Sequence, residues 1–159
     1  MRLALYQPDI PQNTGTLLRM CACLGVSADV IGPAGFDMSD RSLRRAGLDY
    51  LDHVDLTRHQ SWDAFEAARL ASATPARLVL LTSHAVMPYT EFKFAAGDVI
   101  LLGRESAGVP GAVHEQADAR LKIPMHGNLR SLNIAVAAAM VVGEALRQTQ
   151  RDMARQDET

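Results

Sequence analysis

The amino-acid sequence predicts an α/β fold in which a parallel β-sheet is flanked by helices. Short apolar runs of strand length alternate with longer amphipathic stretches along the whole chain. This alternation is typical of parallel strands whose connecting helices cover both faces of the sheet. The chain has 159 residues, of which 48% are apolar, and this suits one compact domain. We expect that domain over residues 1–150, followed by a polar tail over residues 151–159 that frays.

Six apolar runs are predicted to be strands, at residues 3–6, 28–31, 53–56, 78–82, 99–102 and 121–123. The first helix is marked by an apolar face that includes Leu17, Leu18, Cys21 and Leu24. A second amphipathic stretch contains Trp62 and Phe65. The long C-terminal helix is expected to begin near Ser131. Its run 134–142 is apolar without interruption, and a helix that is apolar on every side must be buried.

Three polar loops each follow a predicted strand, at residues 11–19, 103–110 and 124–133. Parallel strands present their carboxyl ends at one edge of a sheet, so these loops point to one shared crevice. Ser131 and Asn133 stand where the third loop meets the apolar helix, and we expect that buried helix to hold them rigidly.

The charge of the chain argues against a protein that coats nucleic acid, because its formal net charge is −2 and its pI is about 6.2. Local contact with a phosphate backbone stays open. Arg41, Arg44 and Arg45 are close in sequence, and Arg41 shares a helix face with each of the other two. If a dimer brings two such arginine clusters together, they would bind phosphates of a nucleic acid. A solvated helix face explains the three arginines equally well. A homodimer is expected because one small domain has difficulty covering the whole apolar run 134–142.

Metal and membrane sites are not predicted. Cys21 and Cys23 are two residues apart in a helical pattern, which directs them to different faces and favours two buried, reduced thiols. The five histidines are scattered without an i, i+4 pair, so we predict no metal. No apolar stretch reaches the roughly 18 residues of a membrane span, and the N-terminus has no signal-sequence pattern. We therefore expect a cytoplasmic protein.

Four ordered motifs resemble the SPOUT superfamily of RNA methyltransferases, and within it the small single-domain tRNA 2'-O-methyltransferases of the TrmL or YibK family. They are Asn13-Thr14-Gly15 followed by Leu17-Leu18-Arg19; the run 44–50; Gly103-x-Glu105-Ser106-x-Gly108-x-Pro110; and Ile123-Pro124-Met125 leading to Arg130-Ser131-Leu132-Asn133. The resemblance covers about residues 3–148. It implies a deep C-terminal trefoil knot, S-adenosylmethionine as methyl donor, and methylation of the wobble nucleotide of tRNA, cytidine or uridine.

The resemblance also implies roles for single residues. The methyl-donor pocket would be lined by Leu81, Gly103, Ile123 and Ser131, with Leu102 and Met125 as near neighbours. Glu105 would pair with Arg19 or brace the donor loop. For Leu81 and Ile123 the alternative is ordinary strand core.

On the RNA side, Arg19 matches the arginine that the family places near the accepting ribose. Because a guanidinium has a pKa above about 12, we assign it to orienting a phosphate and stabilising the developing 2'-alkoxide, not to general base catalysis. Asn13 would hydrogen-bond the ribose or fix the loop geometry, with a helix cap as an equal alternative. Ser131 and Asn133 would position substrate and donor, with a helix cap as the alternative for Ser131.

The chain departs from the family pattern at two places. Apolar residues follow Asn133 where relatives often have a second polar one, and Gly143 stands where an aromatic often precedes Glu144. A glycine inside a helix usually indicates close packing. Two alternatives stay open: methylation of another tRNA position or of ribosomal RNA, and a non-catalytic RNA-binding module of the same fold.

Overall fold

The computed structural model describes residues 1–39, 51–127, 129 and 131–157. Its strands are β1 (Arg2–Tyr6), β2 (Ser27–Ile31), β3 (Leu56–His59), β4 (Leu78–Leu81), β5 (Met87–Pro88), β6 (Val99–Leu102) and β7 (Ala119–Lys122). Its helices are α1 (Pro11–Leu24), α3 (Trp62–Leu70), α4 (Gly111–Gln116) and α5 (Ile134–Asp157), with 3-10 turns η1 (Leu51–His53) and η2 (Tyr89–Glu91).

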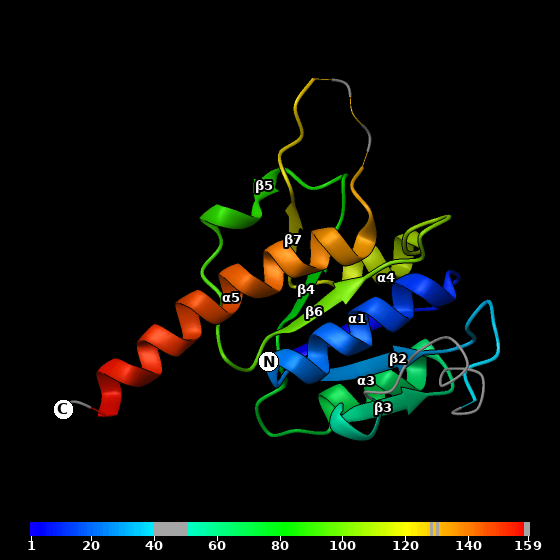
Figure 1. The fold of residues 1–159 in the computed structure, drawn as a ribbon, viewed down its shortest axis with the longest axis horizontal. Helices are drawn as coiled ribbons and strands as arrows, with labels where there is room; N and C mark the ends of the chain where they lie inside the picture. Colours follow the sequence, from blue (N-terminus) through cyan, green and yellow to red (C-terminus); the bar gives the residue numbers. More distant parts are fainter. Residues whose placement is uncertain (40–50, 128, 130, 158–159) are drawn as a thin grey trace.

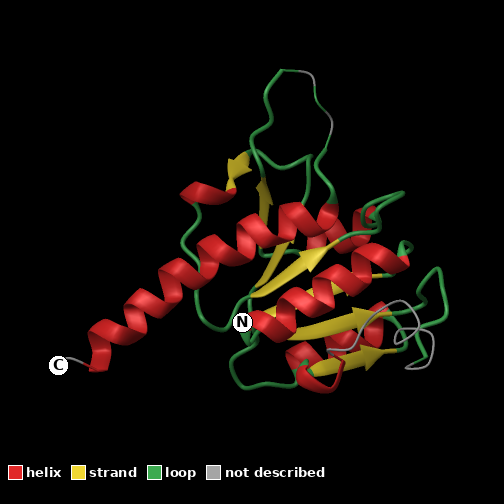
Figure 2. Cartoon of the chain, in the orientation of Figure 1, coloured by secondary structure: helices red, strands yellow, loops and turns green. Residues whose placement is uncertain are grey.

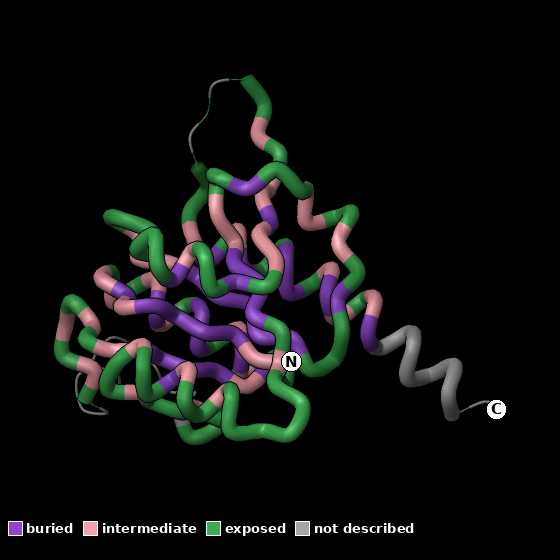
Figure 3. Tube along the Cα trace, turned by 180° about the vertical axis from the view of Figure 1, so that it is seen from behind, coloured by how far each residue is buried: buried purple, intermediate pink, exposed green. Residues whose placement is uncertain are grey.

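The strands form one sheet in the order β3-β2-β1-β6-β4-β7-β5, and every pair of neighbouring strands is parallel (Figures 1 and 2). Because side chains alternate along a strand, the sheet has two apolar faces. One face packs against buried residues of α1 and α5, and the other against Phe65 of α3 and Val113 of α4. The buried residues gather along the central strands (Figure 3). The predicted α/β parallel fold is therefore confirmed.

Two strand predictions are wrong in detail. The third strand begins at Leu56 and not at residue 53, because His53 ends the short turn η1. This strand lies at the edge of the sheet and none of its residues is fully buried, so its hydrophobic pattern is weak. The two-residue strand β5 was not predicted, since Pro88 cannot donate to a ladder and marks only an edge position.

Helix α1 begins with Pro11 in its first turn and ends at Gly25, whose φ of 64° and N–H bond to the Cys21 carbonyl form a left-handed cap. Cys21 is buried and Cys23 exposed, so their side chains point to different faces as predicted, whereas the expected burial of Cys23 is wrong. Burial raises the pKa of the Cys21 thiol to about 12.

Helix α5 starts at Ile134 and not near Ser131, because the Asn133 side chain caps it. Asn133 Oδ1 accepts the amide N–H groups of Ala135 at 2.9 Å and Val136 at 3.4 Å. The helix then continues to Asp157, so residues 151–157 form its last turns, and fraying of this polar end stays a prediction. Adding residues to an existing helix is far less costly than nucleating one, and this sustains a polar helical end.

The expectation that α5 is buried on every side is also wrong within this chain. Its inner face packs on the sheet through Ala135, Ala138, Val141, Val142 and Ala145. Its outer face leaves Val136 51% and Met140 38% exposed. Gly143 lies on the same outer side, and a Cβ placed there would meet no atom within 4 Å, so the close packing expected for it does not occur inside the chain. No helix in the described residues is long and apolar enough to cross a membrane.

Candidate active site

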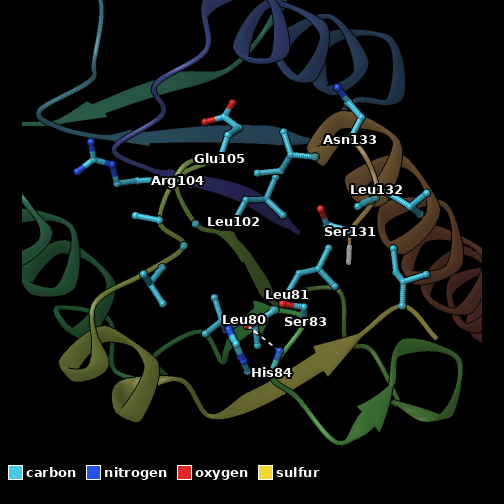
Figure 4. A pocket seen from close by; sticks show the side chains of 18 of the residues that line it. Leu80, Leu81, Ser83, His84, Leu102, Arg104, Glu105, Ser131, Leu132 and Asn133 are labelled. Carbon is cyan, nitrogen blue, oxygen red and sulfur yellow. Dashed lines mark hydrogen bonds between the residues drawn. The ribbon is translucent and has the colours of Figure 1, made fainter. Parts of the chain in front are cut away.

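A cavity of about 730 Å³ opens at the edge of the sheet where β1, β4, β6 and β7 end (Figure 4). This volume lies within the roughly 300–1,000 Å³ that small-molecule sites occupy. The loops after β4, β6 and β7 and the first turn of α1 line it. The polar loops expected to share one crevice are therefore brought together there by the parallel strand order.

Most of the residues singled out from the sequence line this cavity: Asn13, Leu81, Leu102, Gly103, Glu105, Ile123, Met125, Ser131 and Asn133. Leu81 is half-buried at the end of β4, whereas Leu80 before it is fully buried in the opposite face. Leu81 approaches the cavity from the end of β4 and Ser131 from the loop before α5 (Figure 4). Arg19 is exposed on α1 and does not line the cavity. Arg41, Arg44 and Arg45 lie outside the described residues.

Three of these residues form a hydrogen-bonded chain across the loops. Asn13 Nδ2 donates to Glu105 Oε1 at 3.3 Å, and Asn133 Nδ2 donates to Asn13 Oδ1 at 3.0 Å. The other end of the Asn133 side chain, Oδ1, caps α5 and so links this network to the start of that helix. Residues more than 90 positions apart in sequence are thus joined in one network.

Asn13 is not the cap of α1. The cap position belongs to Ile10, which makes no side-chain capping bond, and Asn13 is the third residue inside the helix. Its amide group points instead toward the other loops through the two bonds above. The capping alternative for Asn13 is therefore wrong, because its side chain joins Glu105 to Asn133.

The loop from Gly103 to Gly108 closes on itself. Arg104 N–H donates to the Gly108 carbonyl and Gly108 N–H to the Arg104 carbonyl, both at 2.9 Å. A Cβ at Gly103 would lie 2.7 Å from the Gly108 carbonyl carbon, which is closer than real contacts allow. Gly108 has a φ of 66°. Both glycines are therefore needed for this loop: Gly103 for close approach and Gly108 for the left-handed turn.

Asp9 binds this loop through reciprocal hydrogen bonds. Asp9 N–H donates to Glu105 Oε2 and Glu105 N–H donates to Asp9 Oδ1, both at 3.1 Å. Ser106 Oγ–H donates to Asp9 Oδ2. The hydrogen bond from the Glu105 side chain lowers the pKa of Asp9 to about 2, while burial and the same bond raise the pKa of Glu105. Glu105 thus ties the loop 103–108 to Asp9 and Asn13, and its role toward a methyl donor stays a prediction.

The sequence reasoning missed several cavity residues. Thr82, Ser83 and His84 follow β4 directly, and His114 reaches the cavity from α4. A signal was present, because Ser83 and His84 are polar residues that follow the predicted strand 78–82, like those of the other loops, and Thr82 was assigned to the end of that strand. Asp9 had no such signal, since its role depends on contacts with residues 105 and 106.

No group of three or more His, Cys, Asp or Glu side chains placed to hold a metal ion occurs within the part of the chain that the structure describes. The polar groups of the cavity include loop main-chain groups, amides and hydroxyls, together with the side chains of His84, Arg104, Glu105 and His114. Such a site can hold a polar organic ligand against the apolar side chains of Leu81, Leu102 and Ile123.

Comparison with known proteins identifies relatives over nearly the whole chain. Residues 1–143 match the model of the SpoU rRNA Methylase family. A Beijerinckia indica protein named tRNA (cytidine(34)-2'-O)-methyltransferase is 64% identical over 146 residues, which is 92% of this chain and 90% of that protein. A protein of the same name from Escherichia coli strain K12 is 37% identical, over 93% of each chain.

Solved structures agree with this. One structure, solved to give insight into the 2-OH methylation of C/U34 on tRNA, has a TM-score of 0.83 and 44% identity, and the match covers 92% of this chain and 89% of that one. The SpoU methyltransferase AviRb from Streptomyces viridochromogenes, in complex with the cofactor AdoMet, has a TM-score of 0.80 and 30% identity, over 93% of this chain and 60% of that one.

Proposed function

Since the chain belongs to the SpoU rRNA methylase family, we propose that it transfers the methyl group of S-adenosylmethionine to a tRNA ribose. The acceptor is the 2'-hydroxyl of nucleotide 34, cytidine or uridine, in the anticodon loop, as the names of the relatives indicate. The cavity at the carboxyl ends of the strands carries the proposal, because the motif residues Asn13, Gly103, Ser131 and Asn133 all line it. The same reaction predicts a cytoplasmic protein.

The cavity suits the methyl donor in size and chemistry. Leu81, Leu102 and Ile123 offer apolar contact for the adenosine, and loop main-chain groups around Gly103 and Ser131 offer hydrogen bonds. S-adenosylmethionine supplies a methyl group already activated by its sulfonium. The protein has to hold the ribose hydroxyl in line with that methyl group and help the hydroxyl lose its proton.

Arg19 is assigned to the RNA side of the site. It is exposed on α1, the helix that contains Asn13, and it is not part of the cavity wall. Its guanidinium would orient an RNA phosphate and stabilise negative charge on the 2'-oxygen, with the proton leaving through that phosphate or water. Asn13 and Asn133 hold the helix and the two loops in register for this step.

Two measurements test the activity. Calorimetry with S-adenosylhomocysteine in excess chelator should show binding without metal; a strict requirement for a divalent ion would contradict the proposed site. Transfer of a radioactive methyl group to bulk tRNA should depend on the protein. A map of ribose methylation in a deletion strain then identifies the nucleotide, and loss of a mark elsewhere in tRNA or in ribosomal RNA would change the substrate.

We further propose that two copies of the chain form the active enzyme. The outer face of α5 carries the exposed residues Val136, Met140 and Gly143 at spacings of four and three. A second copy packed there would cover apolar surface that the chain itself leaves open. Arg41, Arg44 and Arg45 of one copy would then hold tRNA phosphates beside the donor pocket of the other.

The dimer is tested by placing a charge on the exposed face. Val136→Asp should convert a dimer to monomers in light scattering and reduce methyl transfer, whereas Leu70→Asp, at a 53% exposed leucine on α3, should do neither. A monomer with full activity at nanomolar protein would refute the arrangement. Charge reversal at Arg44 and Arg45 should weaken tRNA binding and flatten its salt dependence while donor binding stays unchanged.

A further inference from the structure

The segments that follow β1, β2 and β6 all meet at Asp9. The β1 segment supplies Asp9 itself, which stands two residues before α1. From the β2 side, Gly35 N–H donates to the Pro8 carbonyl at 2.9 Å, and a Cβ at Gly35 would come within 3.0 Å of Asp9 Cβ. From the β6 side come Glu105 and Ser106. The side chain of Asp9 is only 16% exposed at this junction.

A carboxylate suits this position because the donor loop presents hydrogen-bond donors to it. Glu105 N–H and Ser106 Oγ–H bind the two different oxygens of Asp9, and an ionised carboxylate accepts at both. Arg104 Nε lies 3.8 Å from Asp9 Oδ2 and adds a positive charge nearby. In return, Asp9 N–H holds one oxygen of Glu105, which leaves the other to orient Asn13.

We propose that Asp9 is a positioning residue of the methyl-donor pocket, an inference that rests on the proposed function. Asp9 does not line the cavity and acts through Glu105. By holding the loop 103–108 at two points, it sets where Gly103 and Glu105 face the donor. Through Glu105 and Asn13 it also sets the position of Asn133 at the start of α5. One side chain thereby couples the donor loop to the loop that carries Ser131.

Substitutions at Asp9 test this role. Asp9→Ala removes both acceptors and should weaken S-adenosylhomocysteine binding at least tenfold by calorimetry, with a matching rise in the KM for the donor. Asp9→Asn keeps an oxygen for Glu105 N–H and should recover affinity to within about threefold of the parent. Ser106→Ala removes one exposed hydroxyl bond and should cost less than Asp9→Ala. Thermal melting confirms that each variant is folded.

The matched control is Asp37→Ala. Asp37 is an exposed aspartate that accepts the same pair of donors from one residue, Ser39 N–H at 2.8 Å and Ser39 Oγ–H at 2.9 Å. It does not line the cavity, so its loss should leave donor binding unchanged. If Asp9→Ala binds within twofold of the parent, or if Asp9→Asn is no better than Asp9→Ala, the positioning role is overturned.

Hydrogen exchange separates this inference from the proposed function. In ligand-free protein, the amides of residues 104–108 should exchange faster in Asp9→Ala than in the parent, and Asp9→Asn should restore their protection. If the parent binds no donor product at all, the proposed function fails, and exchange still decides whether Asp9 holds the loop. Unchanged exchange in Asp9→Ala would overturn the inference even if the enzyme is active.

Discussion

Asp98 and Asp9 lie at opposite edges of the sheet and are bound in different ways. Asp98 precedes β6, is 1% exposed, and accepts Arg77 Nε–H and Nη2–H at 2.8 Å each together with Ala95 N–H. Asp9 follows β1 and accepts main-chain and hydroxyl donors of a loop. Arg104 near it has a buried Nε that makes no hydrogen bond within the described part of the chain.

The difference indicates that the edge where the strands begin stabilises the fold, whereas the edge where they end forms the binding site. At the edge where the strands begin, the bidentate pair of Arg77 with Asp98 neutralises the buried carboxylate charge. At the carboxyl edge, carboxyl groups position loops around a cavity, and polar groups are left for a ligand. We therefore expect substitutions at the amino edge to change stability and those at the carboxyl edge to change binding or turnover.

The largest effect is expected at Arg19. Arg19→Ala should lower methyl transfer about 10²–10³-fold, the scale of losing one transition-state hydrogen-bond donor, and leave donor affinity within a few-fold. Arg19→Lys should rescue poorly, because a point charge lacks the planar fork of guanidinium. Single-turnover transfer and calorimetry measure the two quantities. Near-full turnover in Arg19→Lys would contradict the geometric role.

Asp98→Ala should reduce the free energy of unfolding by about 3 kcal/mol, the low end for breaking a buried ion pair, because the Arg77 side chain is 46% exposed. Donor affinity of the folded variant should not change. Urea denaturation and calorimetry at low temperature test both statements, with Asp37→Ala as a control expected within about 0.5 kcal/mol. A parallel loss of donor affinity would break the proposed separation of the edges.

Gly103→Ala should disrupt the donor loop, since the new methyl group would lie 2.7–2.8 Å from the Gly108 backbone. Overpacking of this kind costs about 1–3 kcal/mol. We expect donor binding to weaken about tenfold or more. Gly97→Ala is the matched control, because a Cβ at Gly97 meets nothing within 4 Å. Equal donor affinity in both variants would show that the loop adjusts without consequence.

The smallest effect is expected at Asn133. Asn133→Ala should destabilise the protein by about 1 kcal/mol through loss of the α5 cap. Asn133→Asp should restore this stability, because its oxygen still accepts from Ala135 and Val136, but it removes the donor to Asn13. Methyl transfer should therefore be lower in Asn133→Asp than in the parent, although the stability is restored. Full activity in that variant would show that the Asn13 bond is dispensable.

Much of the site was predictable because its residues follow strands. The loops after β1, β6 and β7 were recognised from polar residues behind apolar runs, and parallel strands bring such loops to one edge. The loop after β4 was expected at the pocket through Leu81, but its polar residues Thr82, Ser83 and His84 were not singled out. The trefoil knot and the catalytic roles of Arg19 and Ser131 stay predictions from the family resemblance.

The parallel α/β fold and the strands that end at the cavity were predictable, because apolar periodicity and motif order are local properties of the chain. The buried face of α5 was not predictable, since an all-apolar run such as 134–142 has no polar side to mark its orientation, and it became clear from the packing of the folded chain. The same holds for the partners of Asp9, Asn13 and Asn133. These hydrogen bonds join residues more than 90 positions apart, and no local pattern encodes such pairs.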